Sequence, residues 1–178
     1  IPADSPLIVA WATGVAEFAR GPMQAGEIAT PASYGTAEAA FGPSDALLDR
    51  PERPSEIRRV VSLGDGGSIV LTFDSPVTNG PGPDFAVFEN AFRAGNRLFA
   101  ELAVVEVSSD GAEFVRFPPV SLTPVESQVP SFGTLDPRDL WNLAGRHPAG
   151  FGAPFDLEEL ADASPGLDVD RITHIRIV

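Results

Sequence analysis

The sequence contains no cysteine, and it has few basic residues for its number of acidic ones. The absence of cysteine excludes thiol catalysis, zinc fingers, iron–sulfur clusters and disulfide bonds. The 12 Lys and Arg residues stand against 25 Asp and Glu residues, so the formal net charge is −13. Binding to nucleic acid requires a basic surface that displaces counterions, so we expect no nucleic-acid partner. Anionic membrane surfaces are disfavoured for the same reason.

Long hydrophobic runs are also absent. The longest apolar stretch, residues 6–16, is far shorter than the roughly 20 residues of a membrane-spanning helix, so we expect no direct membrane insertion. The opening letters IPADSPL are typical of a processed chain from which a signal peptide has been removed. We therefore expect an exported protein, located at the cell surface, in the extracellular medium or in the periplasm.

Glycine and proline, by contrast, are abundant. The 17 glycines and 18 prolines make up about one residue in five of the 178, compared with a usual ~12 %. A hydrophobic content of 43 % is too high for a disordered tail. The length suits one domain, residues 1–178, and the composition favours a loop-rich, all-β fold.

A two-residue hydrophobic period begins near residue 59 and predicts short strands. Ile69, Leu71 and Phe73 share one face of such a strand, and Thr173, Ile175 and Ile177 share one face of the last. Short strands separated by Gly- and Pro-rich turns are typical of a β-sandwich. The expected strands are two within residues 60–73, on either side of a Gly-rich turn, and one each in 85–89, 101–108, 113–117 and 171–178.

Two long segments interrupt this pattern. We expect residues 1–56 to be an irregular N-terminal part packed on the sandwich, and residues 118–165 to be a long loop insertion. Each contains one predicted helical turn, at 36–41 with Thr36 as its cap and at 156–161.

An ordered set of short motifs resembles a known family. The motifs are AFGPSD (40–45), VVSLGDGGSIVLTF (60–73), GPGPDFAVFEN (80–90), VEVSSDGAEFVRFP (105–118), AGFGAPFDLEEL (149–160) and ITHIRIV (172–178). Together they resemble the galactose-binding-like (discoidin-like) jelly-roll family, in its branch of secreted bacterial cell-surface proteins. The resemblance implies an antiparallel jelly-roll β-sandwich whose ligands bind on loops at one end, with calcium as a structural ion.

Oxygen-bearing side chains near the expected loop ends are candidate calcium ligands. They are Asp45, Asp84, Glu89, Asn90 and Asp156. Strand alternation sends Glu89 and Asn90 to opposite faces unless the strand ends there. The alternative is that these residues make turns and cap strands.

Aromatic and polar side chains in the long segments are candidate ligand-binding residues, because flat rings stack on sugar faces. We expect the segment 132–152 to be the main recognition loop, since it combines Trp, His, Arg and Asn with glycine. The alternative is that the rings only pin the loops to the core. The candidates are Tyr34, Phe92, Trp141 and Phe151 among the aromatics and Arg97, Asn142, Arg146 and His147 among the polar residues, with Arg93 and Asn96 as further hydrogen-bond donors.

Catalysis has little support in the sequence. The two histidines are His147 and His174, no nucleophile-elbow motif is present, and GDGGS fits neither the Rossmann nor the P-loop pattern. We therefore expect a non-catalytic ligand-binding domain that binds a glycan or a cell surface. The alternatives are a capture protein that delivers a small molecule, such as a vitamin or metal chelate, to an outer-membrane uptake system; a hydrolase; and a structural module that contacts a surface or outer-membrane partner protein.

The calcium prediction can be tested by thermal unfolding. A chelator is expected to lower the melting temperature and added calcium to restore it, because an ion that binds only the folded state stabilises that state. The absence of a shift in either direction would contradict it.

Overall fold

The computed structural model describes residues 1–25, 28–45, 60–124, 126, 129–130 and 133–178, and these residues form antiparallel strands with almost no helix. The helical elements of the described residues are short 3₁₀ turns, η1 (Ala37–Ala40), η2 (Pro137–Asp139) and η3 (Leu157–Leu160). The strands are β1 (Gly14–Ala19), β2 (Pro22–Ala25), β3 (Ile28–Pro31), β4 (Ser68–Val77), β5 (Phe85–Val87), β6 (Phe92–Ala94), β7 (Arg97–Phe99), β8 (Val105–Ser108), β9 (Val115–Arg116), β10 (Val120–Ser121), β11 (Leu140–Trp141), β12 (Ala153–Phe155) and β13 (Ile172–Ile177).

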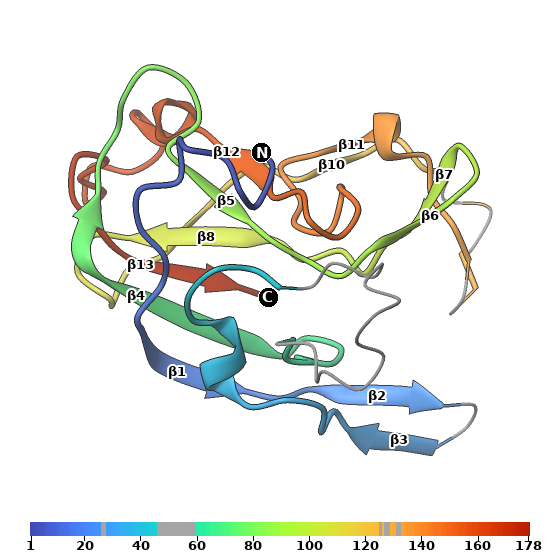
Figure 1. Ribbon diagram of the computed structural model, residues 1–178. Coiled ribbons are helices and arrows are strands. Elements are labelled where there is room, and N and C mark those ends of the chain that lie inside the picture. The colour runs from blue at the N-terminus through green and yellow to red at the C-terminus, as the bar shows by residue number, and fades with distance from the viewer. Residues whose placement is uncertain (26–27, 46–59, 125, 127–128, 131–132) are drawn as a thin grey trace.

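A five-stranded antiparallel sheet in the order β1-β4-β13-β8-β9 forms the main layer (Figure 1). Ile177 of β13 lies between Ile69 of β4 and Val105 of β8. These three residues therefore form a row across the sheet on one face. Because side chains alternate between the two faces of a strand, further apolar rows lie on the same face, and they are buried in the core.

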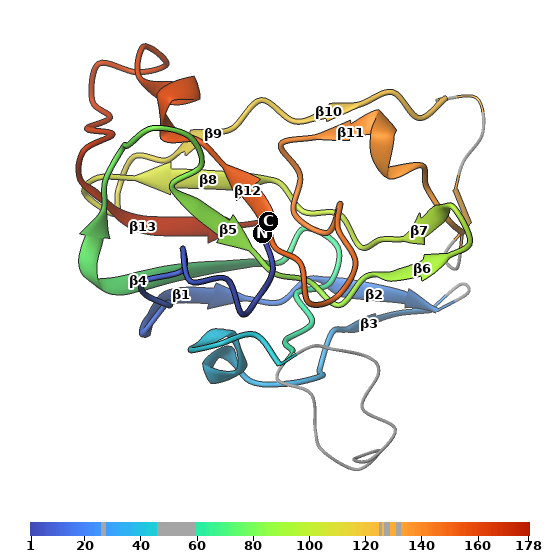
Figure 2. The same cartoon turned by 45° about the horizontal axis from the view of Figure 1, so that its top comes forward.

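The paired strands β5 and β12 lie over this apolar face (Figures 1 and 2). Phe85 of β5 stacks on Phe155 of β12 with ring centroids 5.2 Å apart, and Phe117 meets Phe155 edge-on at 5.0 Å. Phe117 and Phe155 are fully buried, so this aromatic group joins the two layers.

The outer face of the main sheet carries a charged group that is internally compensated. Glu106 of β8 is only 4 % exposed and accepts hydrogen bonds from Arg116 Nε at 2.7 Å and from Arg176 Nε at 2.5 Å. The Arg176 guanidinium also lies 3.9 Å above the ring centre of Phe114. Because Glu106 has two arginine partners, the fold tolerates its charge at a buried position.

The expected all-β, antiparallel character is confirmed, but several strand boundaries differ. The second strand expected in 60–73 is longer than predicted, since β4 runs to Val77, whereas residues 60–63 form no strand. The strands expected in 85–89, 101–108 and 113–117 are shorter, as β5, β8 and β9. The apolar alternation extends beyond the residues that have a neighbouring strand to pair with. Strand pairing, and not alternation, therefore sets where each strand ends.

The face assignment of the last strand was wrong at its start. The pairing of β13 with β4 is irregular between Ile172 and His174, and Ile172 is fully buried in the core with Ile175 and Ile177. Thr173 instead turns its hydroxyl to the Ser108 carbonyl and the His174 ring. A bulge of this kind shifts the alternation by one residue.

Neither long segment is as irregular as predicted. In the N-terminal segment, β1 is an edge strand of the main sheet and β2 pairs with β3, while residues 46–56 lie outside the described residues. The segment 118–165 supplies β10, β11 and β12, so part of it belongs to the second layer. The two expected helical turns are confirmed as η1 and η3, although Thr36 makes no side-chain cap bond.

Truncation of Phe155 tests the contact between the layers. Phe155→Ala is expected to lower the free energy of unfolding by about 3–5 kcal/mol, because it removes a fully buried ring and leaves a cavity. Phe151→Ala, at a half-exposed position, is the matched control and should cost less than about 1 kcal/mol. Urea unfolding of both variants gives the comparison, and equal losses would contradict this account of the core.

Candidate functional site

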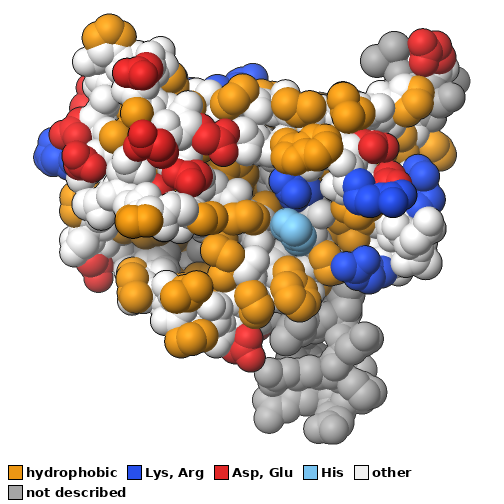
Figure 3. Space-filling model, turned by 90° about the horizontal axis from the view of Figure 1, so that it is seen from above, with side chains coloured by type: hydrophobic (Ala, Val, Ile, Leu, Met, Phe, Trp, Pro, Cys, Tyr) orange, Lys and Arg blue, Asp and Glu red, His pale blue; other side chains and the backbone are white. Residues whose placement is uncertain are grey.

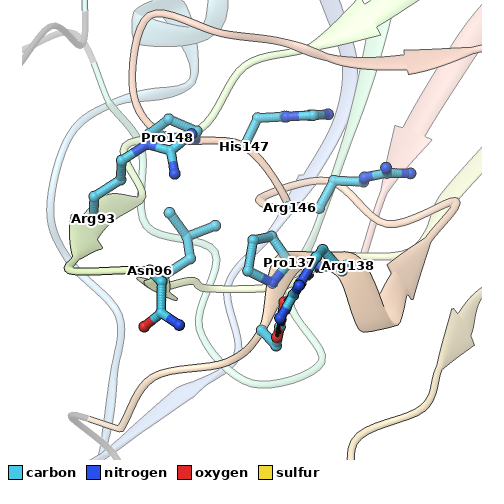
Figure 4. Close-up of a pocket in the computed structure, with 9 residues that line it drawn as sticks. Arg93, Asn96, Pro137, Arg138, Arg146, His147 and Pro148 are labelled. Atoms are coloured by element: carbon cyan, nitrogen blue, oxygen red, sulfur yellow. Dashed lines mark hydrogen bonds and ion pairs between the residues drawn. The ribbon is translucent and has the colours of Figure 1, made fainter.

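A pocket of about 520 Å³ opens between three segments of the chain: the hairpin β6–β7, the turn η2, and the loop of residues 146–148. Its size is in the range of small-ligand sites. Its lining consists of Arg93, Asn96, Leu98, Asp136, Pro137, Arg138, Arg146, His147 and Pro148 (Figure 4).

The hairpin β6–β7 forms one wall. Its turn contains Gly95, whose φ of +65° is a left-handed conformation that favours glycine. Phe92 stacks on Phe99 across the two strands, with ring centroids 4.8 Å apart. Leu98 is buried and exchanges two backbone hydrogen bonds of 2.8 Å with Leu135, so the hairpin is fixed to the segment that leads into η2.

The turn η2 forms the second wall and contains an ion pair. The Asp136 carboxylate caps the turn by accepting a hydrogen bond from the Arg138 backbone N–H at 3.0 Å, and Arg138 Nη2 donates to Asp136 Oδ2 at 2.7 Å. The hydrogen bonds from Arg138 lower the pKa of Asp136 to about 2. Asp136 is therefore ionised at neutral pH, and its charge is used within the pair.

The loop of residues 146–148 forms the third wall. Gly145 precedes it with a φ of +79° and packs so closely on the Glu101 carbonyl that a side chain could not fit. After it, the Ala149 N–H donates to the Ala91 carbonyl at 2.6 Å, which ties the loop to the base of the hairpin. The position of Arg146 and His147 is thus set from both sides.

The electrostatic character of the pocket is positive. Burial lowers the pKa of Arg146, and burial together with the nearby Arg146 charge lowers the pKa of His147. No carboxylate of the described residues forms an ion pair with Arg93 or Arg146. Figure 3 shows Arg and His side chains gathered at the centre and right of this face, while Asp and Glu side chains gather mainly on its left.

The structure brings two of the expected ligand-binding residues, Arg146 and His147, into this pocket, along with the expected donors Arg93 and Asn96. Arg97 lies on the hairpin but directs its Nε to Thr134 Oγ1 at 3.0 Å. Phe92 is on the same hairpin, stacked and 45 % exposed.

The other expected ligand-binding residues do not line the pocket. Trp141 is 44 % exposed on β11 and pairs with Val120 of β10, while the Asn142 amide donates to Glu159 Oε2 at 2.7 Å. Phe151 is half exposed beside the first residues of the chain, which it meets in a β-bridge with Pro2. Tyr34 lies between β3 and η1 in the chain and does not line the pocket.

Sequence reasoning missed Leu98. It included four other lining residues in the segment 132–152 without singling them out, namely Asp136, Pro137, Arg138 and Pro148. The dipeptide Asp136-Pro137 is a turn signal, and a capped turn places the next side chain, Arg138, at a predictable position. That this turn faces the hairpin depends on the contact between Leu98 and Leu135, which are far apart in the sequence.

The pairing of β5 with β12 brings two of the expected metal ligands, Asp84 and Asp156, close together, but both carboxylates accept backbone hydrogen bonds. Asp84 Oδ2 accepts a hydrogen bond from the Leu157 N–H at 2.7 Å, and Asp156 Oδ1 caps η3 through the Glu158 N–H at 3.1 Å. Burial raises the pKa of Asp84, against that hydrogen bond, which lowers it. Within the described residues, no three His, Cys, Asp or Glu side chains come together in a way that could hold a metal ion, and calcium binding stays a prediction.

The remaining expected ligands occupy separate positions. Asp45 follows the turn after η1, whereas Glu89 and Asn90 connect β5 to β6. Burial and the neighbouring Glu101 charge raise the pKa of Glu89 to about 7. A carboxyl group in this state is close to half ionised at neutral pH.

Comparison with protein-family models, curated proteins and solved structures gave no match. No helix in the described ranges is both long and apolar enough to cross a membrane.

The raised pKa of Glu89 predicts a pH-dependent stability. The folded state favours the protonated Glu89 carboxyl. Its contribution to the free energy of unfolding is therefore fully present below pH 4.5 and is lost as the pH rises through about 7. Glu89→Gln is expected to raise the free energy of unfolding by about 1–3 kcal/mol at pH 8 and to have little effect at pH 4.5. Glu113→Gln, at an exposed position, is the control, and a Glu89→Gln effect that is the same at both pH values would contradict the assignment.

Proposed function

We propose that this chain is a non-catalytic ligand-binding domain of an exported bacterial protein, built on a galactose-binding-like jelly roll, and that it binds a glycan. The observation that carries the proposal is the pocket of about 520 Å³, whose lining includes hydrogen-bond donors from two separate segments of the chain. Arg93 and Asn96 come from the hairpin β6–β7, and Arg146 and His147 come from the third wall. Donors that converge on one cavity are suited to the many oxygen atoms of a sugar.

The architecture is consistent with the jelly-roll part of the proposal. The C-terminal strand β13 lies in the middle of the main sheet between β4 and β8, so the connections cross over instead of following a simple meander. The strands β5 and β12, far apart in the chain, pair to cover the apolar face. Crossing connections of this kind occur in Greek-key sandwiches, of which the jelly roll is one.

We infer a non-catalytic role from how the reactive groups of the pocket are used. A hydrolase of the serine type needs His147 in reach of both a carboxylate and a hydroxyl group. Among the described residues, the His147 ring makes no such hydrogen bond, and the one lining carboxylate, Asp136, is engaged by Arg138. The pocket therefore offers donors without an acid–base pair.

Retention on immobilised polysaccharides tests the proposal. The wild-type protein should be retarded, and the double variant Arg93→Ala/Asn96→Ala should lose retention without a fall in melting temperature, since both side chains are exposed. Arg171→Ala, an exposed arginine that lies outside the pocket, is the control for charge. Ligand recovered chemically unchanged supports binding without turnover.

Two results would overturn this function. Cleavage of the bound sugar would make the protein a hydrolase. Retention that survives the hairpin variant and disappears in Trp141→Ala would move the site to the exposed Trp141 ring on β11.

A second candidate is a capture protein for a vitamin or a metal chelate, acting with an outer-membrane uptake system. The observation in its favour is that the site is a pocket, whereas polysaccharide chains are often bound on a flat aromatic surface. Tight stoichiometric binding of such a compound in a thermal-shift screen, without retention on any polysaccharide, would select this candidate.

A further inference from the structure

Arg146 differs from the other half-buried arginines of the described residues in having no partner. Arg20 donates to the Tyr34 and Ser62 carbonyls at 3.2 and 3.3 Å, and Arg176 is paired with Glu106. The Nε atom of Arg146, by contrast, is buried and makes no hydrogen bond. A buried guanidinium donor without an acceptor costs free energy, and no acceptor among the described residues offsets this cost.

The surroundings of Arg146 supply further donors but no free acceptor of opposite charge. Arg93 and His147 line the same pocket, and the carboxylate in its wall, Asp136, is bonded to Arg138 at 2.7 Å. Figure 4 shows the Arg146 and His147 side chains extending side by side, with Arg93 on the far wall and its tip beside Pro148. A group that satisfies such a site carries negatively charged oxygen atoms.

We propose that the pocket binds an oxyanion group of its ligand against Arg146, so that the glycan it takes is an acidic sugar. This inference rests on the proposed function and names its ligand class. The planar guanidinium group donates two parallel hydrogen bonds to a carboxylate or a sulfate ester, a geometry that a neutral hydroxyl group cannot match. Arg93 and His147 line the same pocket and add further donors to it.

The net charge of the chain limits the size of that ligand. At −13, the protein repels a long polyanion, and of the arginines in the described residues only three, Arg93, Arg138 and Arg146, line the pocket. The site thus fits one acidic sugar residue at the end of a chain or within a short oligomer.

Calorimetric titration with matched oligosaccharides tests the inference. A short galacturonate oligomer, a sulfated galactose oligomer and the neutral galactose oligomer of equal length are compared at low salt. The wild-type protein should bind at least one acidic oligomer about tenfold or more tighter than the neutral one, and added sodium chloride should reduce this preference. The tighter of the two acidic oligomers identifies the oxyanion as carboxylate or sulfate.

Two variants of equal charge change make the test specific. Arg146→Gln should abolish the preference for acidic sugars, whereas Arg171→Gln, directly before β13 and outside the pocket, should retain it. Without ligand, Arg146→Gln should melt at or above the wild-type temperature, because it removes an unpartnered buried donor. A marked fall in its melting temperature would mean that Arg146 stabilises the fold, and would count against the inference.

The outcomes separate this inference from the function on which it rests. Equal binding of acidic and neutral oligomers, or a preference that persists in Arg146→Gln, overturns the oxyanion site and leaves glycan binding in place. If no oligomer binds, thermal shifts with galacturonate and with sulfate decide the matter. Stabilisation of the wild-type protein and not of Arg146→Gln would support the oxyanion site and overturn the glycan function, and no stabilisation would overturn both.

Discussion

The structure depends on the pairing of β5 with β12 and on the aromatic contact that holds this pair to the main sheet. Phe155 stacks on Phe85 and meets Phe117 edge-on, at the boundary between the two layers. β5 runs directly into the hairpin β6–β7, and β12 directly follows the loop that carries Arg146 and His147. Because the two strands pair antiparallel, two walls of the pocket emerge side by side from one packed element. The pocket is thus built next to the packed aromatic contact between the two layers.

Charge is distributed over this framework according to whether a partner is present. On the outer face of the main sheet, Glu106 receives two arginines, so a buried carboxylate is compensated within the fold. Asp136 and Arg138 are likewise paired in the wall of the pocket. Arg146 has no such partner, although an acidic chain offers many carboxylates. An uncompensated cation at a half-buried position destabilises the folded state. Such destabilising charges are found at binding sites, where a ligand supplies the partner.

Local patterns in the sequence predicted the elements whose structure is locally determined. The two-residue period of Ile69, Leu71 and Phe73 identified β4, and the segment 156–161 identified η3, because in both cases the determining residues are neighbours in the chain. Loop composition selected Arg146 and His147, which line the pocket. It equally selected Tyr34, Asn142 and Phe151, which lie outside the pocket. Composition marks a segment as able to bind, but it does not say which side chains of that segment face one another.

The sequence by itself determined an acidic, cysteine-free, all-β protein with a last strand predicted at residues 171–178 and found at Ile172–Ile177, because charge, composition and hydrophobic period are properties of the chain alone. The tertiary structure alone decided that Leu98 pairs with Leu135, that β12 pairs with β5, and that Arg93 and Arg146 share a cavity. Each of these contacts joins residues far apart in the chain, and its formation depends on the packing of the whole fold. The bulge that buries Ile172 belongs to the same class, since it arises from pairing with β4 and not from the letters of β13.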